Sequence, residues 1–342
     1  MDVEFGIDTF GDITEDANGK LLPDDAVIRN VIDEAVLADQ LGLDAVGIGE
    51  HHRNDFAISS PDMVLAAIAA RTSRIKLATA VTVLSSDDPV RVFERFSTLD
   101  AISSGRAEVV VGRGSFVESF PLFGYDLQDY EALFEEKLEL FAKLIQGGSH
   151  TWKGTLTQSL DDVELHPRLA SGPLKTWVAV GGSPQSVIRA ATYDLPLMLA
   201  IIGGPVERFA PFADLHRRAL EELGKGPQPI GYHTYGHIAS TDDEARERMY
   251  KPWLEQTRRI GAERGWGRMD RSHFEQEADH GSMAVGSPET VARKIADGVK
   301  ALGATRFQLK ISTGRLPHEA LLDSVHLYAT EVVPLVKDML SE

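Results

Sequence analysis

Asp44-Ala45-Val46-Gly47-Ile48-Gly49-Glu50-His51-His52 is a short apolar run that stops at a carboxylate and two imidazoles. A second run, Ala107-Glu108-Val109-Val110-Val111, stops in the same way at Gly112-Arg113-Gly114-Ser115. Apolar runs of this length are typical of buried parallel strands. Polar clusters at the carboxyl ends of such strands are where α/β proteins place their chemistry. The two runs therefore predict an α/β enzyme that binds a phosphate-bearing ligand.

Strand-like and helix-like segments alternate along almost the whole chain of 342 residues. The alternation makes about eight strand–helix units, the pattern of a (β/α)₈ barrel. No linker rich in proline, glycine and serine divides the chain, so we predict one TIM-barrel domain over residues 1–342. A doubly wound open sheet is the alternative, because periodicity does not show closure. The predicted strands are 5–8, 45–48, 76–84, 107–111, 177–180, 197–202, 230–238 and 306–311, and the predicted helices are 27–41, 61–70, 89–102, 130–145, 184–192, 206–223, 242–263, 288–302 and 317–340.

Two segments interrupt the alternation and predict insertions in the barrel. Residues 147–173 contain two extended pieces, Thr151-Trp152-Lys153-Gly154 and Val163-Glu164-Leu165, which indicate a hairpin. The polar residues around 266–283 indicate an excursion over one face of the barrel.

The composition limits the classes of partner. Acidic residues outnumber basic ones, 52 to 35, and the formal net charge of −17 repels nucleic acid and anionic membrane surfaces. The absence of cysteine excludes disulfides, a thiol nucleophile and thiolate metal sites. The amino terminus shows neither a signal peptide nor a membrane span, which predicts a cytoplasmic protein.

The pair His51-His52 is the first candidate for catalysis. Adjacent side chains on an extended segment face opposite ways, so one imidazole can enter the barrel mouth while the other faces outward. A neutral imidazole beside a carboxylate, here Glu50, suits a general base. The alternative is a histidine pair that only forms hydrogen bonds at the rim. A metal site is disfavoured, because His150, His166 and His233 lie in unrelated segments.

Two glycine-rich loops are candidates for binding phosphate. The loop Gly112-Arg113-Gly114-Ser115 offers a guanidinium, a hydroxyl and accessible backbone N–H groups. Gly181-Gly182-Ser183-Pro184 follows a predicted buried strand and begins a helix, whose amino end attracts anions. Each loop can also be an ordinary connection, with Ser183 as a helix cap. We favour phosphate binding, because the two strands are expected to be neighbours in a barrel.

A series of motifs occurs in one order along the chain and resembles the bacterial luciferase-like flavin monooxygenases. The resemblance is strongest over residues 44–123 and weaker over 204–280. The motifs are Glu50-His51-His52, Thr79-Ala80-Val81-Thr82-Val83-Leu84, Asp88-Pro89-Val90-Arg91, Leu99-Asp100-Ala101-Ile102-Ser103-Ser104-Gly105-Arg106, Val111-Gly112-Arg113-Gly114, Gly181-Gly182-Ser183-Pro184 and Val285-Gly286-Ser287-Pro288-Glu289-Thr290-Val291-Ala292.

The resemblance implies a (β/α)₈ barrel that binds reduced FMN at the carboxyl ends of its strands. It makes His51 the catalytic base beside the flavin ring, with His52 and Glu50 as supporting residues. It places a non-prolyl cis peptide, Ala80-Val81, under the ring and Arg113 at the phosphate. The implied cofactor-binding set is Thr79, Ala80, Val81, Gly112, Arg113, Gly114, Ser115, Gly181, Gly182 and Ser183, and no metal is implied.

The chain departs from luciferase at two of these positions. Luciferase has a reactive cysteine in place of Gly112 and an acidic residue near Gly181. Their absence argues against luminescence itself.

The same resemblance predicts the partners and the reaction. It implies oxygenation of a small organic substrate by O₂ and reduced FMN, with the FMN supplied by a separate flavin reductase. It also implies a homodimer through the helices near 60–70 and 89–102. The alternatives are a deazaflavin-dependent oxidoreductase on the same fold, a catalytically silent flavin-binding protein and a metal-dependent barrel hydrolase.

Overall fold

The computed structural model describes residues 2–16, 18–114, 116–170 and 172–341, and in them a parallel sheet closes into a barrel. Neighbouring strands follow the order β3-β2-β1-β12-β10-β9-β8-β5-β4. The two ends of this path meet, because Leu77 in β3 bridges Ala107 beside β5, and β4 pairs with β5. The predicted TIM barrel is therefore confirmed, and the open sheet is excluded. The strands of the wall are β1 (Glu4–Thr9), β2 (Ala45–Ile48), β3 (Lys76–Thr79), β4 (Thr82–Val83), β5 (Glu108–Gly112), β8 (Lys175–Val180), β9 (Leu197–Ala200), β10 (Ile230–Ile238) and β12 (Arg306–Lys310).

One predicted strand, 76–84, is broken in the structure. It forms β3 and β4, which are separated at Ala80 and Val81 by a cis peptide bond. The apolar pattern is continuous across the break, so it predicted a single strand. The two pieces share one position in the wall, which gives the described barrel eight positions.

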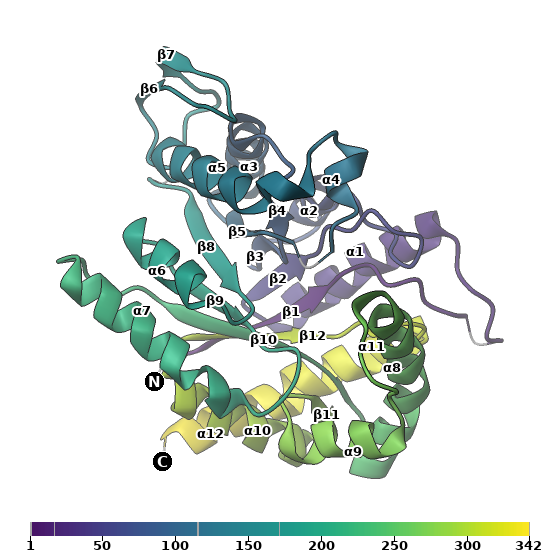
Figure 1. Cartoon of the computed structure of the whole chain (residues 1–342). Coiled ribbons are helices and arrows are strands. Elements are labelled where there is room, and N and C mark those ends of the chain that lie inside the picture. The colour runs from purple at the N-terminus through teal and green to yellow at the C-terminus, as the bar shows by residue number, and fades with distance from the viewer. Residues whose placement is uncertain (1, 17, 115, 171, 342) are drawn as a thin grey trace.

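The helices form the outer layer around the strands, as Figure 1 shows. Alternating side chains of each strand face this layer. Phe5 and Ile7 of β1, for example, belong to the same buried cluster as Val31 and Ala35 of α1. Gly42 ends α1 in the left-handed conformation, at φ 88°, as its C-cap position predicts. The helices of this layer are α1 (Asp24–Leu41), α2 (Pro61–Ala69), α3 (Pro89–Ser103), α5 (Tyr130–Leu144), α6 (Pro184–Thr192), α7 (Ala210–Glu222), α10 (Pro288–Leu302), α11 (His318–Leu327) and α12 (Val333–Ser341).

A buried ionic cluster fills the barrel at the amino ends of its strands. Arg306 is 1% exposed and donates to the carboxylates of Glu4 and Glu108, with 2.7 Å from its Nε to Glu4 Oε2. Trp177 Nε1 donates to Glu108 Oε2 at 3.0 Å, and the guanidinium lies 4.6 Å from the Trp177 ring centroid. These side chains close the barrel at the amino ends of its strands, so ligand access is from the carboxyl ends.

Both predicted insertions carry structure of their own. Residues 149–164 form the antiparallel hairpin of β6 (Ser149–Trp152) and β7 (Leu160–Glu164), which projects beyond the barrel at the top of Figure 1. The second segment contains a helix that the polar sequence did not predict, and a short strand follows it. The predicted helix 317–340 is divided by a π-helical turn. These remaining elements are α4 (Ser119–Leu122), η1 (Leu127–Asp129), η2 (Val206–Phe209), α8 (Asp242–Arg264), α9 (Arg271–His280), β11 (Ala284–Gly286) and η3 (Tyr328–Val332).

Candidate active site

The predicted site residues follow four consecutive positions of the barrel wall. Glu50-His51-His52 comes after β2, the Ala80-Val81 break separates β3 from β4, the Arg113 loop comes after β5, and Gly181-Gly182-Ser183 comes after β8. These strands are neighbours in the order β2, β3 with β4, β5, β8. The carboxyl ends of parallel strands meet at one edge, so the four clusters lie along one side of the barrel mouth.

The two histidines separate as the extended segment predicts. His51 enters a group of aromatic rings, whereas His52 turns away to Glu50. The His52 Nε2 lies 3.1 Å from Glu50 Oε1, and Glu50 Oε2 accepts a hydrogen bond from the Val83 backbone N–H at 3.0 Å. Glu50 therefore ties the histidine segment to β4.

His51 lies in a cage of three phenylalanines. Its ring centroid is 4.2 Å from that of Phe56, 5.0 Å from Phe10 and 5.2 Å from Phe116. Burial in these apolar surroundings lowers the pKa of His51 to about 3. Its Nε2 is buried and has no hydrogen-bond partner among the described residues. His51 is thus a neutral imidazole with an unused nitrogen.

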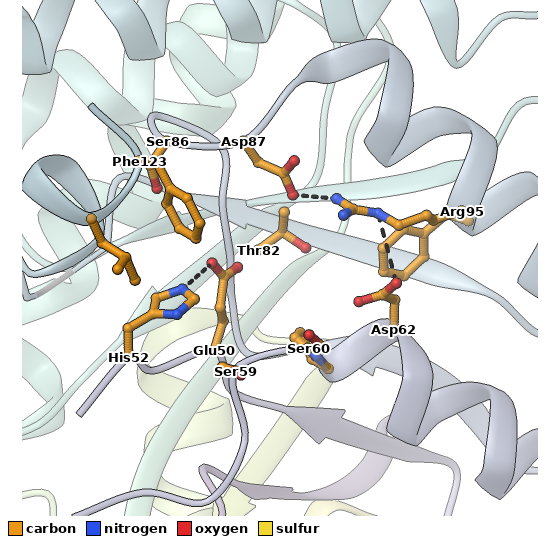
Figure 2. A pocket seen from close by; sticks show the side chains of 13 residues that line it. Glu50, His52, Ser59, Ser60, Asp62, Thr82, Ser86, Asp87, Arg95 and Phe123 are labelled. Carbon is orange, nitrogen blue, oxygen red and sulfur yellow. Dashed lines mark hydrogen bonds and ion pairs between the residues drawn. The ribbon is translucent and has the colours of Figure 1, made fainter. Parts of the chain in front are cut away.

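His52 and Glu50 line a pocket of about 540 Å³ outside the aromatic cage. Figure 2 shows that the pocket extends from these two residues to Asp62, Asp87 and Arg95. Arg95 pairs with Asp87 and lies 3.7 Å from Asp62. The pocket is therefore bounded by α2, α3 and the segment after β4. Two residues of the predicted catalytic cluster, Glu50 and His52, line it. Its other lining residues are Ser59, Ser60, Pro61, Thr82, Ser86, Phe96, Leu122 and Phe123.

The middle of the site is the break between β3 and β4. The cis peptide Ala80-Val81 is present, as the resemblance implies. The Thr79 hydroxyl donates to Val110 O at 3.0 Å and accepts from Thr82 Oγ1 at 3.1 Å. The Thr79 side chain therefore forms its hydrogen bonds with residues of the barrel wall. A Cβ on Gly112 would lie 2.7 Å from Val81 Cγ2, so Val81 and the end of β5 approach too closely for a larger residue.

The Arg113 loop forms the cationic end of the site. The Arg113 guanidinium pairs with Glu131 and lies 5.4 Å from the Tyr130 ring centroid. Tyr130 in turn donates to Gly114 O at 3.0 Å, which fixes the loop against α5. The predicted Ser115 lies outside the described residues.

The second glycine loop leaves open space beside this cation. No described atom lies within 4 Å of the place where a Cβ on Gly181 or Gly182 would stand. Ser183 caps α6 by accepting from the Ser186 N–H. Strand β8 pairs with β5, which confirms the predicted neighbourhood of the two loops. The loop therefore presents backbone and a helix amino end to a ligand.

Several residues of the mouth were not predicted. Arg189 lies on α6, pairs with Glu135 and stands 3.6 Å from Glu131, so it adds a second cation. Asp8 and His233 form a buried pair, with 2.6 Å between Oδ2 and Nδ1. Asp8 is the last residue of a predicted strand, and this position could have marked it as a candidate site residue. The pairing with His233, and the cage around His51, carry no sequence signal because their partners are distant in the chain.

The part of the chain that the structure describes lacks two features of other functional classes. They hold no group of three or more His, Cys, Asp or Glu side chains placed to bind a metal ion. None of the helices that the structure describes is both long and apolar enough to cross a membrane.

The site has two ends of different chemistry, a neutral imidazole among phenyl rings and a pair of guanidiniums beside a helix amino end. The unused Nε2 of His51 and the open space at Gly181 and Gly182 fit a ligand with a flat ring at one end and a phosphate at the other. The fold and the site thus define a barrel with an anion-binding mouth that suits a phosphate-bearing ligand. The model of the luciferase-like monooxygenase family matches residues 3–306, and the chain belongs to this family.

Known relatives agree with this assignment. The chain is 28% identical to 4-hydroxyprotoasukamycin monooxygenase from Streptomyces nodosus subsp. asukaensis, over 86% of this chain and 83% of that protein. The monooxygenase RslO1 from Streptomyces bottropensis superposes with a TM-score of 0.83 at 25% identity, over 97% and 99% of the two chains.

Two further structures share the fold and differ in cofactor. The oxygenating constituent of 3,6-diketocamphane monooxygenase from Pseudomonas putida, in complex with FMN, has a TM-score of 0.78 at 19% identity, covering 98% and 99% of the two chains. An F420-dependent secondary alcohol dehydrogenase has a TM-score of 0.76 at 17% identity, with the same coverage. These two likenesses show the shared fold, and the family match makes the protein a flavin-dependent oxidoreductase.

Proposed function

We propose that the protein is a monooxygenase that uses reduced FMN and O₂ to oxygenate a small organic substrate. The observation that carries the proposal is the neutral, caged His51 at one end of the mouth and the Arg113 cation at the other. One ligand that spans β2, β3, β5 and β8 accounts for both ends.

Different residues of the site bind different parts of the ligand. Arg113, assisted by Arg189, binds the phosphate, and Gly182 and Ser183 offer backbone N–H groups beside it. Ala80 and Val81 support the ring between these groups and His51. Reduced flavin, when bound, supplies two electrons that divide O₂, so that one oxygen atom enters the substrate and the other leaves as water.

His51 acts as a proton acceptor in this site. Its ring is neutral near neutral pH, and its Nε2 faces no competing donor among the described residues. The phenyl rings exclude water, which protects a reactive oxygen species from side reactions. His52 and Glu50 hold the segment that carries His51 against β4.

Titration of the purified protein with FMN tests the cationic end. The wild type is expected to quench flavin fluorescence on binding, and Arg113→Ala to bind at least about tenfold more weakly. Arg29→Ala is the matched control, because Arg29 forms an exposed pair with Asp25 on α1. Equal binding by Arg113→Ala and the control would remove Arg113 from the phosphate site.

The histidine has its own test. His51→Ala is expected to bind FMN but to consume substrate about 100-fold more slowly, the usual contribution of a general base. Substrate consumption at the wild-type rate would exclude the base role.

The second candidate is hydride transfer by a deazaflavin, which the F420-dependent neighbour favours. It predicts substrate turnover without oxygen uptake. Substrate-dependent oxygen uptake with reduced FMN supports the monooxygenase instead.

We also propose a homodimer formed through α2 and α3, with a separate flavin reductase as the source of reduced FMN. Met63 on α2 is 69% exposed and Ile102 on α3 is 52% exposed, as befits an apolar contact. Sedimentation velocity of the wild type and Met63→Lys tests the dimer, which the charge is expected to weaken.

A further inference from the structure

A second histidine, His233, lies in the interior of the barrel with a carboxylate partner. Its Nδ1 is 2.6 Å from Asp8 Oδ2, and the two side chains are 9% and 4% exposed. Asp8 belongs to β1 and His233 to β10, and β12 lies between these strands in the wall. The bond therefore spans β12 inside the barrel.

The pair lies beside the residues already assigned to the cofactor. A Cβ on Gly47 would stand 2.0 Å from Asp8 Oδ1 and 3.1 Å from Ala80 Cβ, so Asp8 and Ala80 flank the same point of β2. The His233 ring stacks on Phe10 at 5.9 Å, with planes 6° apart, and Phe10 also contacts His51 at 5.0 Å. Both imidazoles thus share one phenylalanine.

The two imidazoles differ in what surrounds them. His51 has three phenyl rings and no acidic hydrogen-bond partner among the described residues, and its pKa falls to about 3. His233 has its Nδ1 bound by a carboxylate, which fixes the tautomer and offsets the positive charge when Nε2 takes a proton. His51 has no such carboxylate, whereas the Asp8 carboxylate orients the His233 ring through Nδ1 and leaves Nε2 on the side away from Asp8.

The reaction needs a proton donor. Reduced flavin as its anion, O₂, substrate and one proton give oxidised flavin, oxygenated substrate and water. We propose that His233, oriented by Asp8, donates this proton from Nε2 to the departing oxygen and regains it from solvent. His233 is then a catalytic residue and Asp8 a positioning residue; the inference rests on the proposed monooxygenase function.

Other charged groups near the pair are already engaged. Lys310 on β12 binds Asp12 and the Ser312 backbone, and its ammonium lies 4.5 Å from the Phe10 ring centroid. Tyr235, two residues beyond His233, accepts a hydrogen bond from Trp253 Nε1 at 3.2 Å, and burial raises its pKa to about 12. Asp8 is the carboxylate that bonds His233, and His51 is linked to His233 through the Phe10 ring that both contact.

The test uses two shape-preserving variants and a matched control. His233→Asn keeps an amide near Nδ1 and removes Nε2, and Asp8→Asn removes the charge. The control is Glu34→Gln, which breaks another buried carboxylate–histidine pair, Glu34–His318, at 3.0 Å between α1 and α11.

His233→Asn is expected to bind FMN within twofold of wild type, to turn over about 100-fold more slowly and to release more hydrogen peroxide per O₂ consumed. Asp8→Asn is expected to bind FMN within twofold of wild type and to turn over at least about tenfold more slowly, because the His233 ring is then no longer oriented by a carboxylate. Added imidazole is expected to restore part of the rate to His233→Ala. Glu34→Gln is expected to keep the wild-type turnover rate within twofold.

A readout without flavin accompanies these rates. The far-downfield proton NMR signal of the His233 Nδ1–H is expected in the apo protein and in Glu34→Gln, and is expected to vanish in Asp8→Asn. Loss of the signal with wild-type turnover by Asp8→Asn, or wild-type turnover by His233→Asn, would overturn the inference. If instead FMN binding by the wild type is absent or insensitive to Arg113→Ala, the proposed function itself fails.

Discussion

The imidazole of His51 stacks on the phenyl ring of Phe56, with their centroids 4.2 Å apart and their planes 28° from parallel. The contact leaves no room for water on that face, and Phe10 and Phe116 shield the ring further. A proton on His51 would therefore be poorly solvated, which is the cause of its low pKa, about 3.

Opening this cage is expected to let His51 titrate at higher pH. Phe56→Ala admits water and reduces the burial penalty on the charged ring, so the NMR titration of His51 moves toward the ordinary value of 6.5. Phe212→Ala, which removes an aromatic ring from α7 instead, is the control. A His51 titration that does not change in Phe56→Ala would show that the ring is not what lowers the pKa.

The same pKa predicts how stability depends on pH. In the unfolded chain His51 binds a proton near pH 6.5, whereas in the folded protein it does so near pH 3. Between these values the proton favours the unfolded state, so the contribution of His51 to the free energy of unfolding is complete above pH 6.5 and is lost as pH falls toward 3. In His51→Asn that contribution is absent. Urea unfolding between pH 7 and pH 4 is expected to show a shallower loss of stability in the variant than in the wild type.

Arg189 is expected to strengthen the phosphate end of the site. Its guanidinium lies 3.6 Å from Glu131, the carboxylate that Arg113 also binds, so both cations converge on one position. Arg189→Gln is expected to raise the dissociation constant for FMN about fivefold to tenfold, and less so at high salt. Arg29→Gln is the control, and an equal dissociation constant in the two variants would place Arg189 outside the phosphate site.

Local patterns in the sequence were sufficient to predict the strand–helix repeat and the order of the candidate site loops along it, whereas the closure of the sheet did not follow from periodicity. Strand 45–48 has the predicted bounds, and β5 and β8 are neighbours as the barrel requires. The separation of His51 from His52 followed from strand geometry alone. Each of these features depends on residues close together in the chain or on the repeat itself.

The contacts that determine the chemistry depend on long-range packing instead. His233 and Asp8 are 225 residues apart, and Phe10 meets His51 only because β1 and β2 are adjacent. Arg189 lies on α6, and the sequence pattern of this helix predicts its buried face but does not indicate that Arg189 faces a ligand. No periodicity distinguishes such residues from ordinary strand, loop and helix positions.

Gly112 is expected to tolerate no side chain. A Cβ there would lie 2.7 Å from Val81 Cγ2, so Gly112→Ala forces the end of β5 away from the β3–β4 break. We expect the free energy of unfolding to fall by about 1–3 kcal/mol in urea denaturation. Gly181→Ala, at a position with open space, is the control, and the double variant Gly112→Ala/Val81→Ala is expected to recover part of the loss. An unchanged unfolding midpoint in Gly112→Ala would contradict the close approach.

The ionic cluster at the closed end of the barrel is expected to set the acid stability. Burial alone would raise the pKa of Glu108, but the Arg306 guanidinium lowers it to about 2. The stability that this carboxylate contributes is complete above its unfolded value of 4.5 and is lost as pH falls toward 2. Glu108→Gln leaves Arg306 with one carboxylate partner, so we expect a loss of about 3 kcal/mol or more at pH 7. The loss is expected to shrink at pH 3, whereas Glu164→Gln, in an exposed pair with Arg168, is expected to change little at either pH. Urea unfolding at the two pH values measures the difference in the free energy of unfolding between each variant and the wild type. An equal stability of Glu108→Gln and wild type at pH 7 would show that the cluster does not stabilise the barrel.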